Sequence, residues 1–141
     1  MKLRLYHFDL QLRHPFTISR ETITTQPTLI VELQMDGVSG YGEATANPYY
    51  GRDIDGMLRL LKQNQSKIET ANWEHPAELW ETLEQDLRID TFAQCALDQA
   101  AYDLWGKREQ KSVFRLLGWQ EDAPRPESNY TLGIDLSLIH I

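Results

Sequence analysis

Catalysis needs reactive side chains at spacings that bring them together, and this sequence offers few of them. The histidines are His7, His14, His75 and His140, and no two are spaced as metal ligands usually are. Solvated or helix-capping roles suit them better. Cys95 is the single cysteine, so the sequence contains no internal disulfide and no cysteine-based metal site. We expect Cys95 to be a small, buried apolar residue.

Acidic residues and glycines give equally weak signals. Asp98 and Asp103 are five residues apart, so on a helix they do not share a face well and are a poor pair of metal ligands. The glycines of GVSGYGEA lack a strand-to-helix context, which favours a hairpin over a nucleotide-binding loop. Glu43 ends that segment, where a structural hydrogen bond is favoured over a ligand contact. We therefore predict no catalytic residue and no metal ligand in this chain.

Two polar stretches are better candidates for ligand contact. RHPFTISRETITTQP and TANPYYGRD contain prolines and separate apolar segments, so we expect two long loops. Loops that project from a rigid sheet often form binding surfaces. The side chains proposed for ligand contact are Phe16, Arg20, Glu21, Tyr49 and Tyr50. Ordinary loop packing remains the alternative for each of them.

Alternating apolar residues predict the strands that must position these loops. Apolar residues change phase between residues 3 and 12, which predicts a strand that is bulged or covered on both faces. Leu29, Val31 and Leu33 then alternate strictly. The Asp-Gly pair of MDGV is a strong hairpin signal before VSGYGEA. The sequence therefore predicts a three-stranded antiparallel meander.

Helical patterns follow the sheet. Asp53 or Asp55 can cap a first helix, and Pro76 suits the first turn of another. In TFAQCALDQAAYDLWGKRE, apolar residues recur every four positions from Phe92, and the alanines permit another backbone to approach closely. Gly106, with Lys107 and Arg108, predicts the end of that helix, and SVFRLLG predicts a short amphipathic turn. A sheet followed by a helical bundle belongs to the α+β class.

Composition limits the possible partners. The 141 residues are 41% hydrophobic and 25% charged, as in an ordinary globular domain. A formal net charge of −7 with scattered basic residues argues against binding to nucleic acid or to an anionic membrane. No apolar run approaches a membrane span, and the first residues lack a signal-peptide core. We therefore expect a cytoplasmic protein.

Several motifs together resemble the amino-terminal part of the enolase superfamily, in its muconate-lactonizing branch. They are GYGEA, CALDQAAYDLWGK, LLGW and the predicted strand YTLGID. Within that branch, LQLRHPFTIS and YTLGID most resemble the dipeptide epimerases of the L-Ala-D/L-Glu type. The resemblance extends over nearly the whole chain, up to Asp135.

This resemblance implies an α+β capping domain followed by a β/α barrel. Residues 1–122 would form the capping domain, and residues 123–141 the connector and first barrel strand. A whole barrel takes about 250 residues, so the chain resembles an amino-terminal fragment. The apolar ending LSLIHI, residues 136–141, does not match the polar helix start that relatives usually have there. We interpret that ending as non-native.

The resemblance also implies a chemistry. Family members abstract the proton α to a carboxylate or carboxamide, and Mg²⁺ stabilises the enolate between two barrel lysines. The metal ligands are expected beyond the end of this chain, so the chain alone is expected to be inactive. The expected partner is a dipeptide such as cell-wall-derived L-Ala-D-Glu, and homo-oligomerisation of the full-length enzyme is left open.

Individual residues match the family pattern unevenly. Thr131 falls on the first barrel strand at a position that contacts substrate in relatives, and Phe16 matches an apolar residue of the first capping loop. Glu21 stands where some relatives have a substrate-binding arginine, and neighbouring Arg20 is the candidate substitute. Tyr50 lies on the second capping loop. The alternatives are an o-succinylbenzoate synthase, a muconate-type cycloisomerase, or a non-catalytic binding module that reuses the capping fold.

Overall fold

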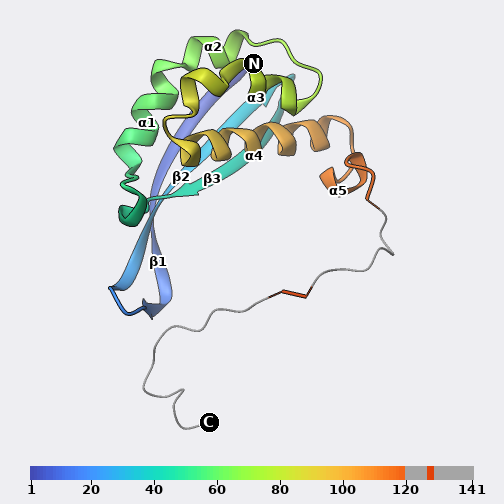
Figure 1. Cartoon of the computed structure of the whole chain (residues 1–141). Helices are drawn as coiled ribbons and strands as arrows, with labels where there is room; N and C mark the ends of the chain where they lie inside the picture. Colours follow the sequence, from blue (N-terminus) through green and yellow to red (C-terminus); the bar gives the residue numbers. More distant parts are fainter. Residues whose placement is uncertain (120–126, 129–141) are drawn as a thin grey trace.

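A three-stranded antiparallel sheet with helices on one face makes up the described part of the chain, residues 1–119 and 127–128 of a computed structural model (Figure 1). The strands are β1 (Lys2–Thr17), β2 (Thr22–Met35) and β3 (Val38–Thr45), paired in the order β1-β2-β3. The helices are the 3₁₀ helix η1 (Pro48–Tyr50), α1 (Ile54–Gln63), α2 (Gln65–Thr70), α3 (Pro76–Leu87), α4 (Thr91–Arg108) and α5 (Val113–Leu116). The predicted α+β meander followed by helices is confirmed.

Local signals in the sequence account for the turn and the helix starts. Asp36 and Gly37 connect β2 to β3 with φ values of 52° and 80°, the left-handed geometry that a two-residue hairpin turn requires. The Asp53 side chain accepts a hydrogen bond from Gly56 N at 2.6 Å and caps α1. His75 caps α3 in the same way, ahead of Pro76 at the first helical position.

The first predicted loop is wrong, because the segment forms the end of a long hairpin instead. β1 continues to Thr17 and β2 begins at Thr22, with Ile18 N donating to Glu21 O at 2.9 Å across the turn. The register is continuous from Lys2 to Gln11 and shifts between Gln11 and Phe16, so the irregularity follows the segment for which a bulge was predicted. The threonines of this segment are β-branched and favour extended backbone even without an apolar pattern.

The predicted helix stop at Gly106, Lys107 and Arg108 is confirmed, since α4 ends at Arg108, although Gly106 itself lies within the helix. Gly106 is buried, and a β-carbon there would lie 3.0 Å from Lys111 O. Its missing side chain lets the chain turn back over the helix, where Lys111 N donates to Gly106 O at 3.0 Å. This glycine therefore serves close packing and does not terminate the helix.

The hydrophobic core lies between the sheet and the helices. Leu29, Val31 and Leu33 of β2 have no exposed surface and face the helices. They pack with fully buried side chains that include Met57, Leu61, Ile68, Leu87 and Leu104. Within residues 1–119 and 127–128, no helix has the length and apolarity needed to cross a lipid bilayer.

Helix α4 packs directly on β3, backbone against backbone. A β-carbon added at Gly40 would overlap backbone atoms of Ala100 and Leu104, and one at Gly42 would overlap Ala96 O. Ala96 and Ala100 are fully buried at this contact, as the alanine spacing predicted. Small residues on both elements therefore set the distance between helix and strand.

Polar side chains of α4 also cover the free edge of β3. Asp103 accepts a hydrogen bond from Tyr41 N at 2.8 Å, and Lys107 Nζ donates to Ser39 O at 3.0 Å. Gln99 both accepts from Glu43 N at 3.3 Å and donates to Glu43 O at 3.1 Å. These contacts satisfy backbone groups that would otherwise be open to pairing with another strand.

The α4–β3 contact predicts a large effect from one added methyl group. We expect Gly42→Ala to lower the free energy of unfolding by about 1–3 kcal/mol, because α4 must move to admit the β-carbon. Glu43→Ala is the matched control on the same strand, and its exposed side chain predicts a change within about 0.5 kcal/mol. Urea denaturation of both variants measures this, and equal effects would contradict the packing argument.

The sheet face opposite the helices contains a buried carboxylate. Glu32 is 4% exposed and accepts hydrogen bonds from the Tyr6 hydroxyl at 2.6 Å, from Ser39 at 2.7 Å and from Arg4 at 3.0 Å. The bonds from Tyr6 and Ser39 lower the pKa of Glu32 below its ordinary value, with Arg4 adding to the effect and burial opposing it. Glu32 is therefore held in its charged form.

This cluster predicts a pH dependence of stability. Because the folded-state pKa of Glu32 is lowered, its stabilisation is present above the ordinary pKa of 4.5 and is lost as the pH falls below it. We expect Glu32→Gln to lower the free energy of unfolding by about 1 kcal/mol or more at pH 7. The difference in unfolding free energy between variant and parent should narrow in urea denaturation as the pH falls below 4.5. A gap that is constant or widens would contradict the lowered pKa.

Candidate functional site

The hairpin end and the segment after β3 meet through a group of side chains that we call the loop cluster, namely Arg20, Tyr49, Tyr50 and Phe92. The Arg20 guanidinium carbon lies 4.9 Å from the centre of the Tyr49 ring. The Tyr49 and Tyr50 rings are perpendicular at 4.9 Å, and Tyr50 lies 5.8 Å from Phe92 in the first turn of α4. The structure thus brings together three of the side chains proposed from the sequence.

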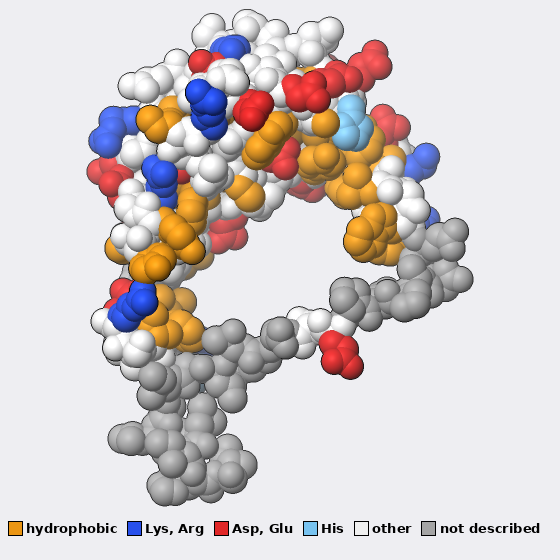
Figure 2. Space-filling model, in the orientation of Figure 1, with side chains coloured by type: hydrophobic (Ala, Val, Ile, Leu, Met, Phe, Trp, Pro, Cys, Tyr) orange, Lys and Arg blue, Asp and Glu red, His pale blue; other side chains and the backbone are white. Residues whose placement is uncertain are grey.

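The loop cluster is exposed on the hairpin side of the molecule. Tyr49 is 70% exposed and Tyr50 is 60% exposed, while Phe92 packs partly against the core. Hydrophobic and basic side chains adjoin at the lower left of the face shown in Figure 2. Because Arg20 and both tyrosines are exposed, a cation and two aromatic rings are available to an incoming ligand.

Backbone and side-chain contacts fix the segment that carries the tyrosines. Asn47 and Arg52 exchange two backbone hydrogen bonds, of 2.9 Å and 3.0 Å, around η1. Arg52 Nη1 lies 3.8 Å from Asp90 Oδ2. Asp90 is buried and also caps α4 by accepting hydrogen bonds from Phe92 N and Ala93 N, each at 3.1 Å. Asp90 therefore joins the second loop to the start of α4.

The other predicted contact residues lie apart from this cluster. Phe16 is half-buried in β1 opposite Ile23, and the exposed Glu21 accepts Ile18 N through its carbonyl. Thr131 falls outside the described residues, as does NYTLGID. Phe92 and Asp90 also belong to the site and were not predicted from the sequence. An aspartate directly before a helical pattern, such as Asp90, is a recognisable helix cap.

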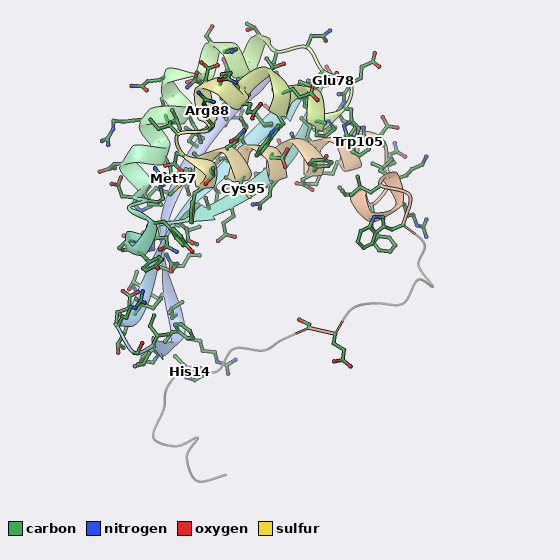
Figure 3. All side chains as sticks on the ribbon, in the orientation of Figure 1. His14, Met57, Glu78, Arg88, Cys95 and Trp105 are labelled. Carbon is green, nitrogen blue, oxygen red and sulfur yellow. The ribbon has the colours of Figure 1, made fainter. Side chains whose placement is uncertain are left out.

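A groove of about 440 Å³ continues from the loop cluster between β3 and α4. It is lined by Glu43, Ala44 and Thr45 of β3 and by Thr91, Phe92, Cys95 and Gln99 of α4. The prediction that Cys95 is buried is wrong. Figure 3 shows this cysteine on α4, where it is exposed with Gln99 Nε2 3.3 Å from its sulfur, because the buried stripe of α4 passes through Ala96 and Ala100.

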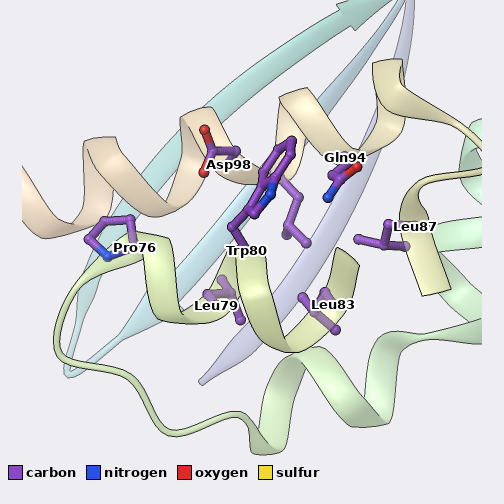
Figure 4. A pocket seen from close by; sticks show the side chains of 8 residues that line it. Pro76, Leu79, Trp80, Leu83, Leu87, Gln94 and Asp98 are labelled. Atoms are coloured by element: carbon purple, nitrogen blue, oxygen red, sulfur yellow. The ribbon is translucent and has the colours of Figure 1, made fainter. Parts of the chain in front are cut away.

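A second cavity lies between α3 and α4 and is too small for a substrate (Figure 4). Its volume of about 10 Å³ holds roughly one water molecule. Partial burial raises the pKa of Asp98, which lines this cavity, while Asp103 binds Tyr41 N and Lys107. The described residues contain no group of three histidine, cysteine or acidic side chains that could hold a metal ion.

Comparison with known proteins identifies the family. The model of the mandelate racemase / muconate lactonizing enzyme amino-terminal domain matches residues 2–118. The chain belongs to this family. The predicted enolase-superfamily capping domain is thereby confirmed, while the proposed boundary near residue 122 falls outside the described residues.

The similar proteins of this family include dipeptide epimerases. An L-Ala-D/L-amino acid epimerase of Flavobacterium johnsoniae is 45% identical over 135 residues, which are 95% of this chain and 40% of the relative. An L-Ala-D/L-Glu epimerase of Bacteroides thetaiotaomicron is 33% identical over 138 residues, 96% of this chain and 35% of the relative. The chain thus spans about 40% of the length of such relatives or less.

A solved structure of the same superfamily shares the fold. A dipeptide epimerase from Enterococcus faecalis V583, complexed with Mg and the dipeptide L-Leu-L-Tyr, superposes with a TM-score of 0.76 and 27% sequence identity. The match covers 95% of this chain and 38% of that one. The capping domain described above therefore corresponds to the part of that enzyme that this chain covers.

The double role of Asp90 predicts different effects of two substitutions. We expect Asp90→Ala to lower the free energy of unfolding by about 1–2 kcal/mol, because it removes the cap of α4 and the partner of Arg52. Asp90→Asn keeps an oxygen for the cap and should cost less than about 1 kcal/mol. Thermal or urea unfolding measures both variants, and equal losses would show that the cap contributes little.

Proposed function

We propose that this chain is the capping part of a Mg²⁺-dependent dipeptide epimerase of the L-Ala-D/L-Glu type that acts in the cytoplasm. The observation that carries the proposal is the loop cluster, which presents Arg20 with two exposed tyrosines where the hairpin end meets the segment after β3. The identity of 45% to an L-Ala-D/L-amino acid epimerase supports the same substrate class.

The chemistry of the proposed reaction belongs to the remainder of the longer protein. A bound Mg²⁺ ion would supply Lewis-acid stabilisation of the enolate formed by loss of the α-proton. The described residues offer no set of ligands for this ion. The family resemblance is the reason that we expect its ligands on barrel strands beyond the end of this chain. What this chain contributes is binding, orientation and the exclusion of water.

Each part of the loop cluster has a role in that contribution. The exposed Arg20 offers a cation for a carboxylate of the dipeptide, such as the side chain of glutamate. Tyr49 and Tyr50 cover the site with aromatic surface, which displaces water and strengthens charge interactions inside. Phe16 on the hairpin, Glu21 at its turn and Thr131 beyond the described residues remain proposed substrate contacts.

The proposal predicts activity for a longer product of the same reading frame and none for the 141-residue chain. With Mg²⁺ present, we expect the longer protein to interconvert L-Ala-L-Glu and L-Ala-D-Glu and to exchange the α-proton for deuterium in D₂O, followed by proton NMR. Addition of EDTA should abolish both signals. Turnover by the 141-residue chain would contradict the assignment of the chemistry to the remainder.

A substrate panel separates the alternatives in the same experiment. The o-succinylbenzoate synthase substrate tests the nearest alternative, and a neutral dipeptide such as L-Leu-L-Tyr tests the preference for an acidic side chain. The proposal would be overturned if the longer protein dehydrated the o-succinylbenzoate synthase substrate and epimerised no dipeptide. A longer protein that folds and acts on none of these substrates would favour a non-catalytic binding module.

A further inference from the structure

The end of the β1–β2 hairpin extends beyond the helices that cover the rest of the sheet (Figure 1). Beyond the register shift between Gln11 and Phe16, it is held by the Ile18–Glu21 backbone bond and a 2.9 Å contact between the Thr17 and Thr22 hydroxyls. An isolated two-stranded ribbon is marginally stable in water. This end of the hairpin therefore needs an external contact to keep one position.

One side chain provides such a contact within the described chain. Residues 12–24 form their hydrogen bonds, ion pairs and ring interactions with β1, β2 or the turn between them, with one exception among the described residues. The exception is the contact of Arg20 with Tyr49. The second loop at the other end of this contact is anchored by the Asn47–Arg52 backbone bonds and by Tyr50 against Phe92. Arg20 thus joins a weakly held ribbon to a firmly held segment.

We propose that Tyr49 is a positioning residue that holds Arg20 through the face of its ring, so that the hairpin end and the segment after β3 act as one unit. The guanidinium carbon at 4.9 Å from the ring centre is within the range of a cation–π contact. The Tyr49 hydroxyl makes no recorded hydrogen bond with a described residue, so the ring supplies the contact. The value of this unit for catalysis rests on the proposed function, whereas the contact itself does not.

Hydrogen–deuterium exchange of the 141-residue chain, read by mass spectrometry, tests the proposal without substrate. We expect Tyr49→Leu to speed exchange of amides in residues 13–24 by about two- to fivefold, the change that an exposed cation–π contact supports. Tyr49→Phe should retain the parental rate, because it keeps the ring. A peptide from residues 28–45 is the internal control and should be unchanged.

A double-variant comparison separates positioning from a general loss of structure. Arg20→Leu should speed exchange at the hairpin end as much as Tyr49→Leu, and the double variant should add nothing further. Additive effects, or faster exchange in residues 28–45 as well, would overturn the proposal. So would parental rates in Tyr49→Leu. Because no substrate is used, these outcomes are independent of whether the longer protein is an epimerase.

Discussion

The close approach of α4 to β3 is the constraint on which the rest of the structure depends. Gly40 and Gly42 remove the side chains that would separate helix from strand, and Ala96 and Ala100 present little more than backbone in return. The first turn of α4 is thereby placed beside the end of β3. Because Asp90 caps that turn and Phe92 belongs to it, a packing contact with no chemistry of its own determines where the second loop lies.

The two faces of the sheet are ordered by different forces. Apolar burial stabilises the helix-covered face, where the inward side chains of β2 are fully buried. The opposite face exposes Tyr6, Phe8 and Tyr41 and gains its order from hydrogen bonds to Glu32. That second source of order depends on ionisation and so responds to pH, whereas the packing between α4 and β3 does not.

The sequence predicts what local patterns determine. Strict alternation in β2, the Asp-Gly turn and the capping aspartate Asp53 each act over a few residues, and each appears as expected. The hairpin end was mistaken for a loop because strand pairing there depends on a partner that a polar pattern does not reveal. Cys95 was misjudged because a helix face that contacts a sheet is decided by the sheet. The contact of Arg20 with Tyr49 joins the hairpin end to the segment after β3, so no local spacing could indicate it.

The loop cluster also shows how one arginine can serve two purposes under the proposed function. A guanidinium that rests on an aromatic face keeps its N–H donors in its own plane, where a carboxylate can bind them in pairs. Contact with Tyr49 and recognition of an acidic dipeptide are therefore compatible. A lysine ammonium group at the same position is not planar, so it could not stack one face on the ring and keep paired donors at its edge for a carboxylate. The choice of arginine, next to the glutamate at position 21, thus fits a side chain that is oriented before its ligand arrives.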